Sequence, residues 1–336
     1  MNQTTPDNSS QAAINFTETA PTEVIQQIFS WIHPSQNVSL KLLNRRVHQC
    51  LSSISFATIN LFRFIPSGNS SVQDASLVIG SMPLDEFDRG LFMWPEEYQY
   101  ALVAVKYKYR ARMIWETKKL RGRLTPALGE MKNAETLGLG QNQLTGQIPR
   151  ELGQLQNLQY LNLSRNFLSG EIPSELGQLS NLWYLALNGC SLEGSIPKEL
   201  GNLSKLETLY LGGNELSGRI PAELGQLSNL TSLHLNSNKL RGFIPPEFGQ
   251  LTKLKEFYLQ LNKLEGGLPS ELGGLSACLY FNVTGNLLSG PIPPEIERLN
   301  LLQFFQKGND LDVPVEQAIR MINHVRQCDL TNPYLS

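Results

Sequence analysis

The stretch LQYLNLSRNFLSGEIPSELGQLSN, residues 158–181, is followed directly by LWYLALNGCSLEGSIPKELGNLSK, residues 182–205. Both stretches carry leucines, a glycine, an Ile-Pro pair and a glutamate at the same positions. The Ile-Pro pair, or Leu-Pro in one unit, recurs every 24 residues from Ile148 to Ile292. A fixed period of this length is the sequence signature of a solenoid, in which each unit stacks on the next.

The first half of each unit predicts a short strand. In Leu161-Asn162-Leu163, apolar and polar residues alternate, which is typical of a half-buried strand. We expect these strands to pair in parallel, centred on Leu137, Leu161, Leu185, Leu209, Leu233, Phe257 and Phe281. An asparagine follows each strand, except where Cys190 replaces it, and its amide should bond backbone groups of adjacent coils.

The second half of each unit, I-P-x-E-L-G, predicts a short helical turn. Proline suits the first position of such a turn and glycine suits its end. The glutamate then falls in the first turn, where unpaired N–H groups and the helix dipole favour a negative charge. The ladder of glutamates is therefore interpreted as structural rather than as a metal or catalytic site.

The full unit, L-x-x-L-x-L-x-x-N-x-L-x-G-x-I-P-x-E-L-G-x-L, resembles the plant-type leucine-rich repeat over residues 113–309. The resemblance implies an α/β repeat solenoid with a parallel sheet on its concave face, which binds another protein. Residues 54–112 are expected to be a linker and a capping helix that begins near Trp94. A second capping helix is expected from Asp312 to Cys328, within a C-terminal segment of residues 310–336.

The concave face of such a solenoid would be neutral and rich in tyrosine, a residue that favours protein interfaces. The expected outward residues form two rows. One row lies between the two strand leucines of each repeat and runs from Gly138 to Gln306. The other row lies directly before the first strand leucine, and its last member is Phe304. From these rows we predict a partner-binding set of Tyr160, Asn162, Arg165, Tyr184, Tyr210, His234, Glu256, Tyr258, Tyr280 and Phe304. The alternative is that some of these tyrosines only stack on one another along the sheet.

The N-terminal part has a different pattern. Residues 1–14 are polar and are expected to be a disordered tail. Within residues 15–53, PTEVIQQIFSWI (21–32) and LKLLNRR (40–46) resemble an F-box, although Ala20 stands where that family usually has leucine. The resemblance implies docking on the Skp-type adaptor of cullin-type ubiquitin ligases, through Pro21, Val24, Ile28, Leu40 and Leu43.

Composition argues against several other classes of function. The net charge of −2 gives no general attraction to nucleic acid or to acidic lipid. The basic stretch from Lys106 to Arg123 leaves an RNA or membrane patch as an alternative, but a solvated helix face is the preferred interpretation. The scattered histidines and the absence of phosphate-binding or nucleophile motifs predict a non-enzyme without metal or cofactor.

The N-terminus shows no basic or apolar region typical of a signal peptide, so a cytoplasmic or nuclear location is expected. The combined hypothesis is a substrate-recognition subunit of a Skp–cullin–F-box ubiquitin ligase, a monomer within a larger complex. The F-box would hold the adaptor, and the concave face would hold the protein substrate. The alternative is a cytosolic scaffold or inhibitor whose N-terminal helices only cap the solenoid.

Overall fold

The computed structural model describes residues 57, 86–312 and 327–328. The chain divides into two compact units after Arg110. The predicted tail, the whole F-box-like segment, residues 54–56 and 58–85 of the predicted linker, and residues 313–326 and 329–336 lie outside the described residues.

The described part of the first unit is helical. Helix α6 (Glu86–Met93) precedes α7 (Glu96–Leu102), which continues into a π-helical turn over Val103–Tyr107. The prediction of a helix beginning near Trp94 is confirmed, and Pro95 is its N-cap. A regular helix that begins near Trp94 would place Tyr109 on the same face as Tyr98 and Ala101, which are buried, but Tyr109 is 68% exposed. The π-helical turn holds an extra residue, and this rotates the following positions away from the buried face.

Asp88 is buried within this helical unit. Its carboxylate accepts hydrogen bonds from Lys106 Nζ at 2.7 Å and from the Tyr107 hydroxyl. A buried carboxylate needs such partners because desolvation would otherwise oppose its charge. Lys106, the first residue of the predicted basic patch, is therefore engaged inside the helical unit.

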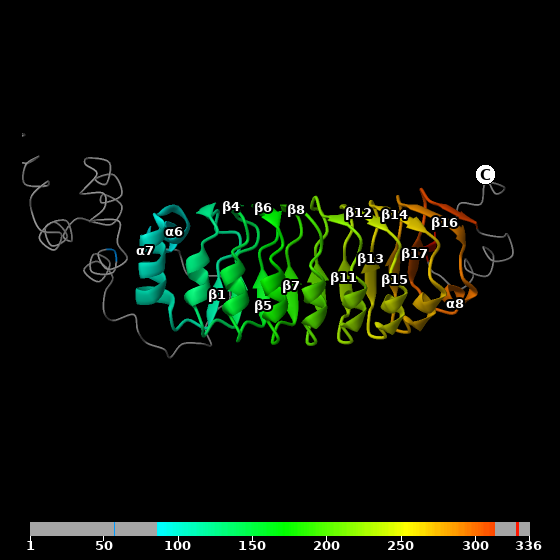
Figure 1. Ribbon diagram of the computed structural model, residues 1–336, viewed down its shortest axis with the longest axis horizontal. Coiled ribbons are helices and arrows are strands. Elements are labelled where there is room, and N and C mark those ends of the chain that lie inside the picture. The colour runs from blue at the N-terminus through cyan, green and yellow to red at the C-terminus, as the bar shows by residue number, and fades with distance from the viewer. Residues whose placement is uncertain (1–56, 58–85, 313–326, 329–336) are drawn as a thin grey trace, which may run out of the picture. The chain divides into compact units, whose positions relative to one another are not determined.

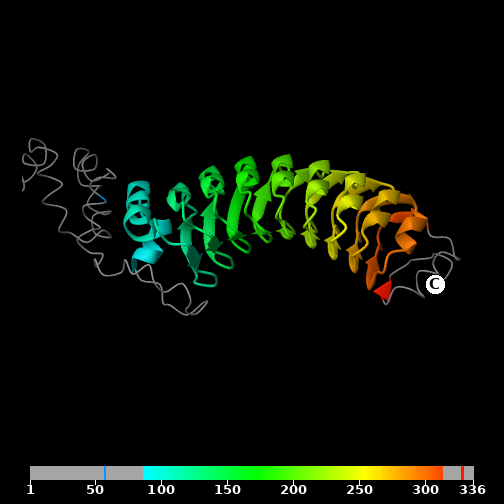
Figure 2. The same ribbon diagram turned by 90° about the horizontal axis from the view of Figure 1, so that it is seen from below.

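The second unit is a row of stacked coils, and its curvature places the largest sheet on the inner side (Figures 1 and 2). All strands of this concave sheet pair in parallel, in chain order. They are β1 (Arg112–Ile114), β3 (Thr136–Gly138), β5 (Tyr160–Asn162), β7 (Tyr184–Ala186), β9 (Thr208–Tyr210), β11 (Ser232–His234), β13 (Glu256–Tyr258), β15 (Tyr280–Asn282), β17 (Gln303–Phe305) and β19 (Gln327–Cys328). The seven predicted strand centres from Leu137 to Phe281 are confirmed.

Short helical turns form the outer, convex side of the coils (Figure 2). They are the 3-10 turns η2 (Pro126–Glu130), η3 (Arg150–Gln154), η4 (Ser174–Gln178), η5 (Lys198–Asn202), η6 (Ala222–Gln226), η7 (Pro246–Gln250) and η8 (Ser270–Gly274), followed by helix α8 (Pro294–Glu297). They form at the predicted I-P-x-E-L-G segments, but the proline of the pattern is the N-cap, one residue before the predicted first position, as Pro149 is in η3. In the first turn, Thr125 is the N-cap and Pro126 is the first residue.

Two narrower parallel sheets join the concave and convex sides. The first holds β2 (Arg121–Arg123), β4 (Gln143–Gly146), β6 (Phe167–Glu171) and β8 (Ser191–Glu193). The second holds β10 (Ser217–Gly218), β12 (Lys239–Gly242), β14 (Lys263–Gly266), β16 (Leu287–Pro291) and β18 (Asp310–Asp312). The repeated leucines of every coil fill the space between these sheets and the convex turns, and they are buried.

The asparagine after each strand ties its coil to the preceding one, as predicted. Asn142 Oδ1 accepts from Leu120 N at 3.0 Å, while its Nδ2 donates to Trp115 O at 2.7 Å and to Leu139 O at 2.8 Å. The same arrangement recurs along the coils as far as Asn309. Cys190 breaks the ladder, since its Sγ lies 3.6 Å from Leu163 O and 4.0 Å from Asn188 O.

The glycine that ends each convex turn has a second role beyond ending it. A Cβ placed on Gly153 would lie 2.4 Å from the Glu175 backbone oxygen of the next coil. The same conflict would arise between Gly177 and Glu199, at 2.3 Å. Only a residue without a side chain lets neighbouring convex turns approach this closely. The L-G glycines therefore set the packing distance on the outer side.

The last coil departs from the 24-residue register. Phe281 pairs with Phe304, so the spacing here is one residue shorter than in the other coils. This shift puts Phe304 in the core, fully buried, and Gln303 at the outward position before it. Gln306, expected outward, takes the place of a core leucine and is buried. Cys328, expected in a helix, lies instead in β19, which pairs with β17.

Candidate partner-binding face

A continuous row of aromatic rings crosses the concave sheet from β5 to β13. We call Tyr160, Tyr184, Tyr210, His234 and Tyr258 the aromatic row. Successive ring centroids are 4.4, 6.0, 4.2 and 4.6 Å apart, so each ring contacts the next. All five side chains are half-buried. All five belong to the predicted partner-binding set, and the structure brings them together.

The row changes position within the strands between β7 and β9. Tyr160 and Tyr184 precede the central leucine of their strands, whereas Tyr210 and His234 follow it. Ala186 is the residue opposite Tyr210 in the pairing of β7 with β9. Its small, buried side chain leaves space for the Tyr210 ring to reach Tyr184 diagonally. A larger residue at position 186 would separate the two halves of the row.

Trp183 extends the row toward the side of the solenoid. Its indole centroid lies 5.8 Å from that of Tyr160 and 5.7 Å from that of Tyr184. Its side chain is 40% exposed, which is unusual for a residue of this size. Trp183 was not predicted because it directly precedes β7, outside the two strand positions from which outward residues were expected. The sequence did contain a signal, since Trp183 stands at a repeat position where the neighbouring repeats have polar residues, Gln159 and Glu207.

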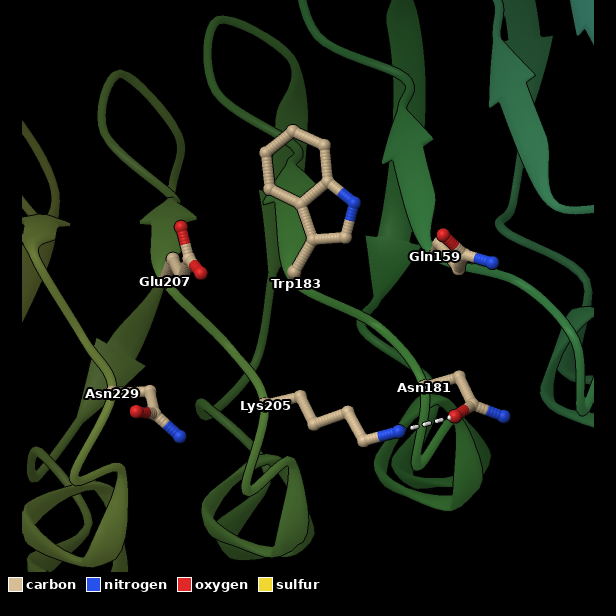
Figure 3. Close-up of a pocket in the computed structure, with 6 residues that line it drawn as sticks. All are labelled: Gln159, Asn181, Trp183, Lys205, Glu207 and Asn229. Atoms are coloured by element: carbon tan, nitrogen blue, oxygen red, sulfur yellow. Dashed lines mark hydrogen bonds between the residues drawn. The ribbon is translucent and has the colours of Figure 1, made fainter.

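An open depression surrounds Trp183 (Figure 3). Its lining consists of Gln159, Asn181, Trp183, Lys205, Glu207 and Asn229. Lys205 Nζ donates to Asn181 Oδ1 at 2.7 Å across the depression, as the dashed line in Figure 3 shows. The depression combines an exposed indole with amide and charged groups. It therefore offers apolar contact area and hydrogen-bonding groups beside the aromatic row.

The phenol groups of the row remain protonated. Burial is the main factor that raises the pKa of Tyr160, Tyr184, Tyr210 and Tyr258 above the usual value. Nearby carboxylates act in the same direction, namely Glu116 on Tyr160 and Glu256 on Tyr210. The row thus presents neutral hydroxyl groups that can both donate and accept hydrogen bonds.

His234 is held neutral within the row. Burial lowers the pKa of its imidazole, and the hydrogen bond with Glu256 opposes that shift only in part. His234 Nε2 lies 3.0 Å from Glu256 Oε2. The ring stacks on Tyr210 with a centroid distance of 4.2 Å. Near pH 7 this histidine acts as an aromatic surface and a hydrogen-bond donor rather than as a cation.

Glu116 reaches the row from the first coil, although it was not among the predicted residues. Its Oε1 accepts from Asn162 Nδ2 at 2.7 Å and lies 3.4 Å from the Tyr160 hydroxyl. The side chain passes over Gly138, where a Cβ would lie 3.0 Å from Glu116 Oε1. The bare glycine on β3 therefore makes this long-range contact possible.

The remaining predicted residues divide into three groups. Arg165 is exposed at the turn after β5, and Glu256 and Tyr280 pair across β13 and β15 on the same face. Asn162 was predicted to be available to a partner, but it is buried beneath Glu116 and bonded to Ser164. Phe304 is a core residue because of the shorter last coil. The predicted adaptor-binding residues Pro21, Val24, Ile28, Leu40 and Leu43 lie outside the described residues.

A family described as a leucine-rich repeat region matches two overlapping segments of the chain, residues 126–242 and 174–278. Residues 126–278 are a leucine-rich repeat region. The predicted fold class, a leucine-rich-repeat solenoid, is confirmed by this match together with the parallel sheet and the convex turns. No curated protein matches the chain.

Among solved structures, the leucine-rich repeat region is similar to plant receptor proteins. One is the Arabidopsis receptor kinase HAESA in complex with the peptide hormone IDA and the co-receptor SERK1, with 34% identity and a TM-score of 0.61. Another is the leucine-rich-repeat ectodomain of the membrane receptor kinase GASSHO1/SCHENGEN3 from Arabidopsis thaliana, with 33% identity and a TM-score of 0.52. A third is the plant peptide hormone receptor RGFR1 in complex with RGF2, with 31% identity and a TM-score of 0.51.

The matches cover 66%, 67% and 60% of this chain but only 38%, 30% and 36% of HAESA, GASSHO1/SCHENGEN3 and RGFR1. The chain therefore spans between 30% and 38% of the length of these proteins. The expected cytoplasmic or nuclear location is overturned, because these neighbours include an ectodomain of a membrane receptor and receptors of peptide hormones. Among the described residues, no helix is long and apolar enough to cross a membrane.

Proposed function

We propose that this chain is an extracellular or membrane-associated binding protein, not an enzyme, that holds a peptide or protein segment across the aromatic row. The observation that carries the proposal is the continuous row of half-buried rings from Tyr160 to Tyr258, with Trp183 exposed beside it. Aromatic residues of this kind supply large contact areas with polar tips, and they dominate the binding energy of many interfaces.

The neighbours support the class of partner. The HAESA structure contains a peptide hormone, and the RGFR1 structure contains RGF2. Extended segments suit a surface that runs across several strands, since successive side chains can contact successive coils. The concave face therefore fits an extended chain better than a small compact ligand.

Site-specific photo-crosslinking tests where the partner binds. A photoreactive amino acid is placed at Tyr258 on the concave face or at the exposed Gln226 on the convex turn η6. The full chain is then irradiated in an extract of the tissue that expresses it, and adducts are identified by mass spectrometry. We expect a specific adduct from position 258 and none from position 226. Adducts from position 226 alone would contradict the proposal.

Alanine substitutions test the aromatic contribution. Trp183→Ala and Tyr184→Ala should each weaken partner binding by roughly 2 kcal/mol, about 30-fold. Phe167→Ala is the matched control, because Phe167 is an exposed aromatic residue on β6, outside the concave sheet. Equal losses for all three variants would mean that the effect is not specific to the concave face.

The sequence of residues 15–53 supports a second proposal, a substrate-recognition role in a ubiquitin ligase. Only the F-box-like motif carries it, and the receptor neighbours give it no support. Ile28→Asp and Leu43→Asp should then abolish pull-down of a Skp-type adaptor without changing the melting of the repeat unit. Tyr184→Ala should leave adaptor binding intact. Retention of the adaptor by both aspartate variants would refute this role.

A further inference from the structure

We propose that the segment held on the aromatic row is basic, and that two of its cationic side chains bind the carboxylates of Glu116 and Glu256. The inference rests on the proposed function, since it specifies the chemistry of the partner on the same face. It follows from how these two carboxylates are held, from the charges around them and from the distance between them.

Among the residues that the structure describes, only neutral groups contact the Glu116 carboxylate. Asn162 Nδ2 donates to Oε1 at 2.7 Å, and the Tyr160 hydroxyl lies 3.4 Å from the same oxygen. The side chain is half-buried, and it lies over Gly138 rather than extending into solvent. These contacts orient the carboxylate at one end of the aromatic row without offsetting its negative charge.

The Glu256 carboxylate is held in a similar way at the other end. Its Oε2 lies 3.0 Å from His234 Nε2, and its side chain is 35% exposed. Because burial lowers the pKa of His234, the ring is neutral near pH 7 and does not compensate the carboxylate. Lys255, the preceding residue, is exposed and forms no ion pair with Glu256 in the described part of the chain.

Neither carboxylate has a Lys or Arg nitrogen within salt-bridge distance among the residues that the structure describes. Other ion pairs in the solenoid do not involve these two carboxylates, as in Lys239 with Glu215 and Arg150 with Glu151. Opposite charges attract more strongly at a partly desolvated site than in bulk water. Arginine and lysine also bind favourably over the face of a tryptophan, and the indole of Trp183 is exposed beside the aromatic row. The face is thus complementary to a cationic segment.

The separation of the carboxylates sets the spacing of the cations. Glu116 contacts residues of β5, and Glu256 contacts His234 of β11. The sheet order β5-β7-β9-β11 places three strand intervals between these contacts, about 14 Å at the usual strand spacing. An extended chain covers this distance in about four residues. The partner segment is therefore expected to carry Lys or Arg at positions i and i+4, with a side chain between them over Tyr184 and Tyr210.

Selection from a displayed random peptide library tests the inference on the full-length chain. Peptides are enriched on the unsubstituted protein and then depleted on the double variant Glu116→Gln, Glu256→Gln. Glutamine keeps an oxygen acceptor for Asn162 and removes only the charge. We expect the surviving peptides to carry Lys or Arg four residues apart. Each single glutamine substitution should weaken a selected peptide about tenfold, and binding should weaken between about 50 and about 500 mM salt.

Glu271→Gln is the matched control, because Glu271 is an exposed carboxylate in the convex turn η8. It should leave the affinity of the selected peptides unchanged. Should a concave variant unfold, citrulline in place of arginine in the peptide removes the same charge while the protein remains unsubstituted. An equal affinity of the citrulline peptide would overturn the inference.

The outcomes separate this inference from the proposed function. Neutral or acidic peptides whose binding still requires Trp183 and Tyr184 would refute the basic partner and leave the proposed binding face standing. Failure to enrich any peptide that depends on Trp183 and Tyr184 would refute both. Basic peptides that bind the glutamine variants equally well would show that their charge acts elsewhere, and would also overturn the inference.

Discussion

The rings of Tyr160 and Tyr184 stack face to face, with centroids 4.4 Å apart and planes inclined by 10°. The two residues pair directly across β5 and β7, so the stack follows from the strand register. This contact uses the ring faces between the two coils. A partner is then left with the ring edges, the hydroxyl groups and the exposed indole of Trp183.

The stack should contribute modestly to folding. In a double-mutant cycle of Tyr160→Ala and Tyr184→Ala, we expect a coupling energy of about 0.5–1.5 kcal/mol in the free energy of unfolding. Urea denaturation followed by circular dichroism measures it. If the row served folding alone, the same two variants would bind a crosslinked partner as well as the unsubstituted protein does.

Repair of the asparagine ladder should stabilise the repeat unit. Cys190→Asn would restore an amide donor toward Leu163 O, where Sγ now lies 3.6 Å away. We expect the variant to gain about 1 kcal/mol. The converse change, Asn214→Cys, weakens bonds to Leu187 O and Leu211 O and should cost about 1–3 kcal/mol. The melting temperature should therefore rise for Cys190→Asn and fall for Asn214→Cys, relative to the unsubstituted protein. A shift in the same direction for both variants would contradict this account.

The glycine contacts on the convex side give a sharp test of packing. Gly177→Ala would force a Cβ to within 2.3 Å of Glu199 O, so the coils must move apart. We expect a loss of about 2 kcal/mol or more, in the range of strongly overpacked sites. Gly267→Ala is the control, since its Cβ would meet only Ser289 O, at 3.6 Å. An equal effect of the two alanines in urea denaturation would rule out the close-approach explanation.

The register of the last coil can be checked with adjacent residues. Phe304→Ala removes a fully buried ring and should cost about 3–5 kcal/mol. Gln303→Ala changes a half-buried polar side chain on the concave side and should change stability by about 0.5 kcal/mol or less. If the 24-residue register continued without interruption, Phe304 would lie at the surface, and Phe304→Ala would reduce stability only slightly.

His234 should make folding sensitive to acid. Its pKa in the folded protein lies below the usual value, so the unfolded chain binds more protons as the pH falls below about 6.5. Stability contributed by the neutral ring is then lost on acidification. Between about pH 7.5 and about pH 5, the melting temperature should fall more for the unsubstituted protein than for His234→Gln. Parallel curves for the two proteins would show that the ring titrates normally.

The strand positions could be predicted because the leucine period fixes which residues face the core. The same reasoning gave the residues of the aromatic row, since side chains alternate along a strand. The same reasoning failed at Phe304, where the last coil is one residue shorter than the others. Phe304 and Phe305 are adjacent aromatic residues, so the local sequence does not indicate which of them faces the core. Glu116 could not be predicted either, since its contact depends on a side chain that crosses the bare Gly138 to another coil.

The interruption of the ladder at Cys190 has a mechanical consequence. A joint with weaker hydrogen bonds resists pulling less, and the long thiol contact marks such a joint between the coils of β5 and β7. The stacked rings of Tyr160 and Tyr184 span that same joint. A partner bound across both rings would hold the joint closed under tension. Occupancy of the concave face would then determine how much force the solenoid withstands.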